Sequence, residues 1–384
     1  MWLNKSLLFT IVLLSIVSCR QGNSSLPSQA EYESILSHAT EIVLTEHDSG
    51  WFEVSIMNPW DSTALLQRLA LIPENLSADS LMIPEVLTPV IIPLQRSLVT
   101  STVHIGLLEE LGSLENISAV TDVPYIASET IKKKIHQGDI VDCGTWMAPN
   151  IEKIILHHPD AILISPYQNG GNYSHLANIG IPIIYTADYL EKSPLGRAEW
   201  MKYYGLLYGK AGQADSLFSS IEREYTSLKL KADSLAAQKP RKKVLLDVPT
   251  SGLWYVPEAG ATNHQYIEDA GGQNPFAYRN GGEIITLPPE KVVYDAYDAD
   301  IWIIRYGAAG DLTSKILMAD YPYASRFKAF SDHNIWWCNT FKVPYFEETP
   351  FHPELLLKDF FEIINNPDVS DDSLRYFSRL EPVN

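Results

Sequence analysis

The chain has 384 residues, of which 46% are hydrophobic and 11% aromatic, and it carries a formal net charge of −18. These proportions are typical of a globular protein with a sizeable core, and the length predicts two or three domains. No basic block is long enough to follow a phosphate backbone, so the composition argues against nucleic acid as a partner.

Residues 1–19 have the pattern of a bacterial lipoprotein signal peptide. Lys5 supplies a small positive region, and the apolar stretch 6–16 that follows is too short to remain as a membrane span. Small residues then precede Cys19, which matches the lipobox cysteine that is acylated. An ordinary cleaved signal peptide is the alternative. Residues 20–29 are polar, as a tether requires, and lipid chains on Cys19 would hold the protein to a membrane.

Residues 30–95 predict a strand-rich segment. Short apolar runs such as EIVLTEH, WFEVSIM and LQRLALIP are separated by turn residues. Asp48-Ser49-Gly50 is the clearest hairpin signal among them. We expect this segment to be an extension that packs on the lobe that follows it.

Residues 96–194 alternate between strand and helix patterns. Strands are expected at 97–102, 160–166 and 181–187, and helices at 104–113, 150–158 and 173–180. Alternation at this spacing predicts βαβ units and a parallel sheet, which forms a first α/β lobe.

Residues 195–240 predict a long linking helix. The stretch from 195 to 238 is charged and lacks proline, and its apolar residues recur at helical spacing until Lys239-Pro240 ends it. Strand and helix patterns then alternate again through 241–384. The expected fold is therefore α/β, with two lobes built on central parallel sheets and joined by a single long helix, an arrangement that resists large hinge motion.

Four motifs resemble one family of binding proteins. They are Asn150 to Leu163 (NIEKI followed by HPDAIL), Tyr266 to Gly272 (YIEDAGG), Ile285 to Val292 around Pro289-Glu290, and Pro350 to Asp359 (PFHPELLLKD). Each is weak alone, but their order and spacing behind a lipobox resemble the helix-linked (class III) solute-binding lipoproteins of ABC importers, in the ferric-siderophore, heme and cobalamin group.

The resemblance implies capture of a metal chelate between two lobes and its delivery to an ABC permease dimer in the inner membrane. An iron complex such as a ferric siderophore or heme is the first expectation, and cobalamin is the alternative. The implied location is the periplasm, with a lipid anchor in the membrane. Parallel α/β sheets also bind ligands beyond the carboxyl ends of their strands, which agrees with a site between lobes.

The ligand candidates are mostly aromatic side chains in predicted loops at strand ends. Flat rings can cover a corrin, porphyrin or catechol face, an arginine fork can meet planar anions, and a histidine can hydrogen-bond the ligand or ligate its metal. The alternatives are core packing for the aromatic residues, a salt bridge for the arginine and a helix cap for the histidine. The candidates are His104, Trp146, Tyr167, Trp254, Tyr255, Arg305 and Tyr345.

Glu152 and Glu290 carry a different expectation. The resemblance implies one exposed glutamate on each lobe that pairs with arginines of the permease. Both residues fall near the start of a predicted helix, where a carboxylate is favourable in any case because of the helix dipole.

Three other expectations follow. A direct Zn or Mn site needs three or four converging His, Asp or Glu side chains, and beyond His104 the loops supply few. The chain lacks the G-x-S-x-G, P-loop and H-E-x-x-H motifs, so it is not expected to be an enzyme, and no cofactor is expected apart from the cargo. Cys143 and Cys338 are expected to be buried thiols; a disulfide is the alternative.

Overall fold

The computed structural model describes residues 34–382 apart from 169–175, 177, 280 and 282–283. The predicted signal peptide 1–19, the tether 20–29 and Cys19 lie outside these residues, as do four of the eight residues of the helix expected at 173–180. Within the described part of the chain, none of the helices has the length and apolar character that a membrane span requires.

The strand-rich extension forms a sheet of its own. Its strands are β1 (Ile42–Glu46), β2 (Phe52–Met57), β3 (Leu65–Pro73) and β4 (Thr88–Ile92), in that order across the sheet. The β1–β2 and β2–β3 pairs are antiparallel, and β4 lies parallel to β3. The predicted hairpin joins β1 to β2, and Gly50 takes the positive φ of 83° that glycine adopts without strain.

The first lobe is built on five parallel strands. They are β5 (Ser97–Val99), β6 (Ile117–Val120), β7 (Val141–Asp142), β10 (Ala161–Ile164) and β11 (Ile183–Tyr185), in the order β11-β10-β5-β6-β7. The helices α1 (Thr102–Glu110), α2 (Glu129–Gln137) and α3 (Ile151–His157) connect them. Side-chain caps fix two of the starts, because Ser128 accepts a hydrogen bond from the Ile131 amide and Asn150 one from the Lys153 amide.

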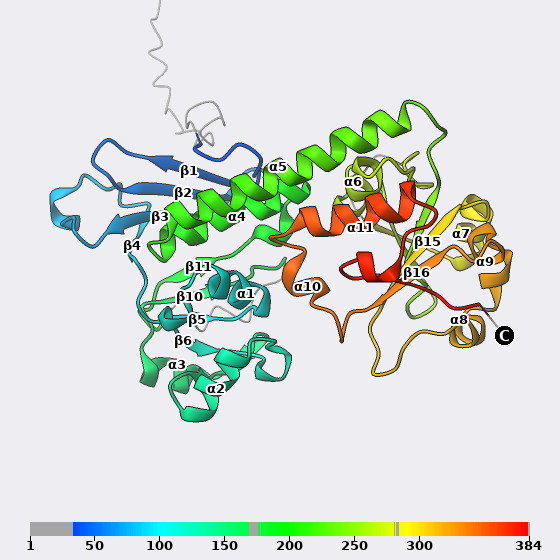
Figure 1. Ribbon diagram of the computed structural model, residues 1–384. Helices are drawn as coiled ribbons and strands as arrows, with labels where there is room; N and C mark the ends of the chain where they lie inside the picture. Colours follow the sequence, from blue (N-terminus) through cyan, green and yellow to red (C-terminus); the bar gives the residue numbers. More distant parts are fainter. Residues whose placement is uncertain (1–33, 169–175, 177, 280, 282–283, 383–384) are drawn as a thin grey trace, which may run out of the picture.

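The linking region contains two helices where the sequence predicts a single long one. α4 (Pro194–Leu207) packs along α5 (Ala211–Ala236), and the chain turns between them at Gly209, whose φ is 66°. A Cβ at this glycine would also come within 3.2 Å of Pro93. The single long helix of 26 residues is α5, which Figure 1 shows running from one lobe to the other.

α5 contributes to both hydrophobic cores. Phe218 and Ile221 belong to the core that the extension shares with the first lobe. Tyr225 belongs to a core of the second lobe, and its hydroxyl donates to the Asp269 carboxylate at 2.7 Å. One rigid element is therefore anchored at successive turns in each lobe.

The second lobe repeats the α/β arrangement with a smaller sheet. β12 (Val244–Leu246), β15 (Ile301–Tyr306) and β16 (Ile335–Asn339) are parallel, and β17 (Ser378–Arg379) is antiparallel at the edge. β13 (Trp254–Pro257) and β14 (Ile284–Leu287) form a separate antiparallel pair. The helices are α6 (Thr262–Asp269), α7 (Pro289–Ala296), α8 (Ser314–Asp320), α9 (Lys328–Ser331), α10 (Tyr345–Glu348) and α11 (Pro353–Asn365). Cys143 and Cys338 are buried free thiols, as predicted.

Two buried glutamates hold the chain that leads into the extension. Glu199 of α4 accepts hydrogen bonds from the backbone amides of Ser37, His38 and Ala39 at 2.7–3.0 Å. Glu191 accepts from the next two amides, those of residues 40 and 41. Burial by itself would raise the pKa of Glu199, but these amides and Lys202 lower it. The carboxylates therefore attach the extension to the first lobe through charge-assisted hydrogen bonds.

We expect Glu199→Ala to lower the free energy of unfolding by about 3 kcal/mol, because it leaves buried amides without an acceptor. Glu199→Gln keeps one acceptor oxygen and should cost less. The measurement is urea denaturation at pH 7. Glu224→Gln, on an exposed position of α5, is the matched control and should change little. A Glu199→Ala protein as stable as this control would contradict the assignment.

A protonated histidine connects the two lobes. His352, just before α11, has its Nε2 2.7 Å from Glu110 of α1 and its Nδ1 2.9 Å from Glu354. Burial opposes the charge, but the hydrogen bonds to both carboxylates raise the pKa of His352 to about 10. The imidazolium is therefore present at neutral pH and bridges a first-lobe helix to the second lobe.

This raised pKa predicts a pH-dependent stability. A group whose folded pKa lies above its unfolded value of about 6.5 stabilises the fold fully below that pH, and the contribution is lost as the pH rises towards 10. Denaturation at pH 6 and pH 9.5 should show a larger stability difference between wild type and His352→Gln at the lower pH. A difference that does not change with pH would refute the bridging role.

Candidate ligand cavity on the first lobe

A cavity of about 810 Å³ lies at the carboxyl ends of the first-lobe strands. This is the edge at which parallel α/β sheets bind ligands, and the volume is within the range of about 300–1,000 Å³ found for small-molecule sites. The wall comes from the segments after β5, β6, β10 and β11, from a short hairpin, and from the start of α4. The lining residues are Thr100–His104, Asp122, Tyr125, Thr145–Met147, Ser165–Tyr167, Asp188, Tyr189 and Arg197.

The hairpin of β8 (Gly144–Thr145) and β9 (Ala148–Pro149) presents Trp146 and Met147 at its tip. The hairpin is held in place by Asp122, whose carboxylate accepts a hydrogen bond from the Trp146 amide at 2.7 Å. Trp146 is 38% exposed, and its ring meets that of Tyr167 edge to face, with centroids 5.7 Å apart. The two rings form an aromatic corner of the cavity.

A buried carboxylate, that of Asp188, also lines the cavity. One oxygen of Asp188 is 2.8 Å from His104 Nε2 and also accepts from the Tyr204 hydroxyl at 3.3 Å. The other oxygen accepts from Arg197 Nε at 3.3 Å. Burial would raise the pKa of Asp188, but His104 and then Arg197 outweigh it and hold the pKa below its usual value. Asp188 is therefore an ionised, fully surrounded carboxylate.

The sequence candidates divide between the two lobes. Trp146, Tyr167 and His104 all line the cavity, although His104 is only 2% exposed and its Nε2 pairs with Asp188. Tyr255 is 47% exposed on β13 but belongs to the second lobe, away from this cavity. Whether any of them touches a ligand stays a prediction.

Three second-lobe candidates occupy positions other than the expected exposed wall. Trp254 packs in the lobe's core and is therefore only 2% exposed, and its indole N–H donates to the Leu246 carbonyl. Tyr345 is 4% exposed in another part of that core. Arg305 is already paired, since its Nε donates to Asp247 at 2.9 Å. Trp254 and Tyr345 are thus buried and Arg305 is paired, and whether any of the three contacts a ligand stays a prediction.

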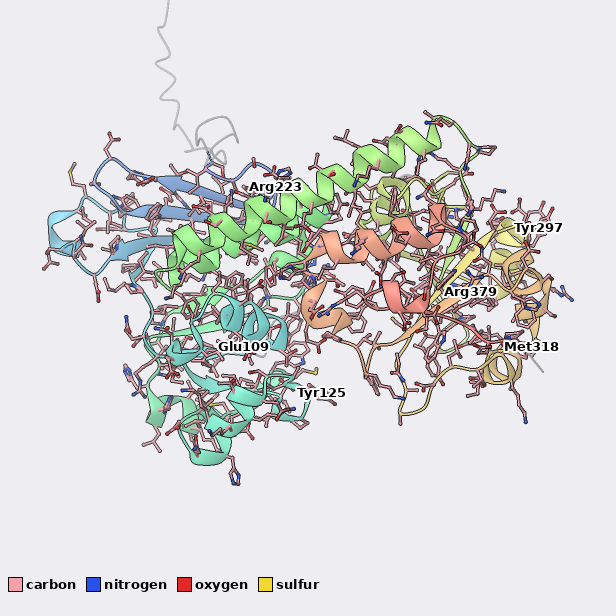
Figure 2. The ribbon with its side chains drawn as sticks, viewed as in Figure 1. Glu109, Tyr125, Arg223, Tyr297, Met318 and Arg379 are labelled. Carbon is pink, nitrogen blue, oxygen red and sulfur yellow. The ribbon has the colours of Figure 1, made fainter. Side chains whose placement is uncertain are left out.

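The structure adds cavity residues that the sequence reasoning missed. Tyr125 follows β6, and Figure 2 shows it on the side of the first lobe that faces the second. The rule used for Tyr167, a residue after a parallel strand, would have found it. Tyr189 also lines the cavity, and burial raises its pKa to about 12. Arg197 comes from the first turn of α4, far from any strand end, so no sequence pattern pointed to it.

The described residues that line this cavity belong to the first lobe and the start of α4, whereas the expected site lay between both lobes. Across the part of the chain that the structure describes, His, Cys, Asp and Glu form no group of three or more that could hold a metal ion. The cavity thus offers aromatic rings, hydroxyl groups and the ion pair of Asp188 and Arg197 to a bulky ligand.

This chain is similar to known proteins both in sequence and in fold. The family described as periplasmic binding protein matches residues 99–338. An uncharacterized lipoprotein of Methanocaldococcus jannaschii is 28% identical over 257 residues, which cover 64% of this chain and 59% of that relative's length.

Two solved structures share the fold at low sequence identity. A possible iron-binding (periplasmic solute-binding) protein of Staphylococcus epidermidis aligns with a TM-score of 0.56 and 17% identity, over 71% of this chain and all of that one. A periplasmic heme-binding protein of Pseudomonas aeruginosa aligns with a TM-score of 0.56 and 13% identity, over 76% of this chain and all of that one.

Proposed function

The chain belongs to the periplasmic binding protein family, and we propose that it captures a metal chelate and delivers it to the permease of an ABC importer. The proposed cargo is an iron complex such as a ferric siderophore or heme, with cobalamin as the alternative. The protein would act outside the cytoplasmic membrane, in the periplasm, held to the membrane by lipid on Cys19. No catalytic activity is proposed.

The observation that carries this proposal is the aromatic cavity at the strand ends of the first lobe. Its volume of about 810 Å³ suits a bulky complex, and the edge-to-face pair of Trp146 and Tyr167 offers a ring face and a ring edge to a flat or macrocyclic ligand. A site for a free Zn or Mn ion finds no support, because the described residues form no suitable ligand group.

α5 supports the same function through its rigidity. A helix of 26 residues is about 39 Å long; its first half lies in one core, and Tyr225 and Leu228, further along, lie in or against the other. The lobes are thus kept at a nearly constant separation. Such a protein binds its ligand with small movements and presents a stable surface to a permease.

The proposed docking residues lie on separate lobes. Glu152 on α3 and Glu290 on α7 are both exposed. Each helix also exposes apolar or aromatic side chains beside its glutamate, such as Leu156 at 88% and Tyr294 at 79%. A carboxylate beside exposed apolar surface is the combination expected of a docking face, because charges guide the encounter and apolar area supplies affinity.

The cargo is tested by titrating residues 20–384 with ferric hydroxamates, hemin and cyanocobalamin while following tryptophan fluorescence. We expect one chelate class to quench the emission and free Zn²⁺ to have no effect. Trp146→Ala should lose most of that quenching and weaken binding at least about tenfold, since it removes a ring from the cavity wall. Trp60→Ala, in the extension, is the control and should bind normally. The absence of binding by every chelate would refute the function.

Docking is tested with the double variant Glu152→Ala/Glu290→Ala. Ligand affinity should stay at the wild-type value, because neither residue lines the cavity. Uptake through the cognate permease in reconstituted vesicles should fall at least about tenfold. Glu224→Ala, an exposed glutamate of α5, is the matched control. Normal uptake by the double variant would remove these residues from the docking face.

A further inference from the structure

The proposed ligand cavity has an unusual balance of charge for a site that receives iron chelates. Among its described lining residues, the basic side chains are Arg197 and His104, and the acidic ones are Asp122 and Asp188. The formal charges sum to −1 with a neutral His104 and to zero with a protonated one. An anionic chelate would therefore meet no excess of positive charge.

Asp188 is the acidic residue that directly contacts the basic side chains of the cavity. Its side chain is 2% exposed and contacts both basic side chains of the cavity, His104 through one oxygen and Arg197 through the other. The Tyr204 hydroxyl donates a third hydrogen bond. A carboxylate so enclosed stays ionised and in place, so its charge acts permanently on the two basic side chains beside it.

We propose that Asp188 is a specificity-determining residue, whose negative charge offsets the basic side chains of the cavity and so makes it select neutral metal chelates over anionic ones. This inference rests on the proposed function and adds the charge class of the cargo. It concerns what the wall rejects as well as what it binds, because specificity is a difference between affinities.

The wall can still hydrogen-bond a neutral chelate. Arg197 directs its Nε–H to Asp188, and the guanidinium has further N–H donors in its fork, which can reach amide or hydroxamate oxygens. Its side chain is 28% exposed, so part of the fork is accessible. His104 Nδ1 is buried and has no hydrogen-bond partner among the described residues. Trp146 and Tyr167 add apolar contact that is independent of ligand charge.

The test compares two iron chelates of different charge. Wild type should bind ferrichrome, a neutral trihydroxamate, at least about tenfold more tightly than ferric enterobactin, a trianionic tricatecholate. In Asp188→Asn, which keeps the shape but removes the charge, that ratio should fall about tenfold or more, equivalent to about 1.4 kcal/mol. The change should shrink in high salt, as a charge effect does.

Two further variants keep the result interpretable. Arg197→Gln leaves the Asp188 charge less compensated and should move the ratio in the opposite direction. Asp298→Asn removes the same charge from a half-buried pair with Lys243 at the amino end of the second-lobe strands, and should leave the ratio unchanged.

The outcomes separate the two proposals. If wild type binds both chelates equally, or if a folded Asp188→Asn protein keeps the wild-type ratio, the role of Asp188 is refuted while the capture function stands. If wild type binds neither of these chelates, nor hemin, nor cyanocobalamin, the proposed function itself fails. Should Asp188→Asn not fold, the Arg197→Gln ratio decides, and an unchanged ratio there refutes the charge balance.

Discussion

The architecture depends on one helix that is packed into two cores at once. Apolar residues of α5 face the first-lobe core over its first half, and Tyr225 begins the contact with the second lobe, where α5 packs along α11. Because a helix is stiff over this length, burial in both cores fixes the relative position of the sheets (Figure 1). The extension reinforces one end, since its strands share the same core as α4 and α5.

Carboxylates make the decisive polar contacts around this frame. Glu199 and Glu191 hold the chain before β1, Glu110 and Glu354 hold His352 between the lobes, and Asp188 holds His104 and Arg197 at the cavity. For Glu199, Glu191 and Asp188, the cost of burying a charge is offset by several donors that the fold places around it. An acidic chain thus uses part of its charge inside, where it fixes geometry.

The cavity belongs to the lobe that the extension and α4 stabilise. Its wall combines the aromatic tip of the β8–β9 hairpin, at Trp146, with the hydrogen-bonded carboxylate of Asp188. Ligand shape is therefore read mainly by rings and ligand charge by the buried network. The second lobe, by contrast, carries exposed aromatic side chains such as Phe341 after β16, which is 74% exposed.

The sequence by itself determined the class of fold, because the alternation of apolar strands with amphipathic helices is a local pattern and fixes a parallel sheet in each lobe. It also placed the hairpin at Gly50, where glycine geometry acts over a few residues. Only the tertiary structure decided which strand-end residues face a cavity. Trp254 and Trp146 look alike in sequence, yet one fills a core and the other a cavity wall, and Arg197 joins the site from a helix distant from any strand end. Burial and charge pairing depend on which elements meet, and no local pattern records that.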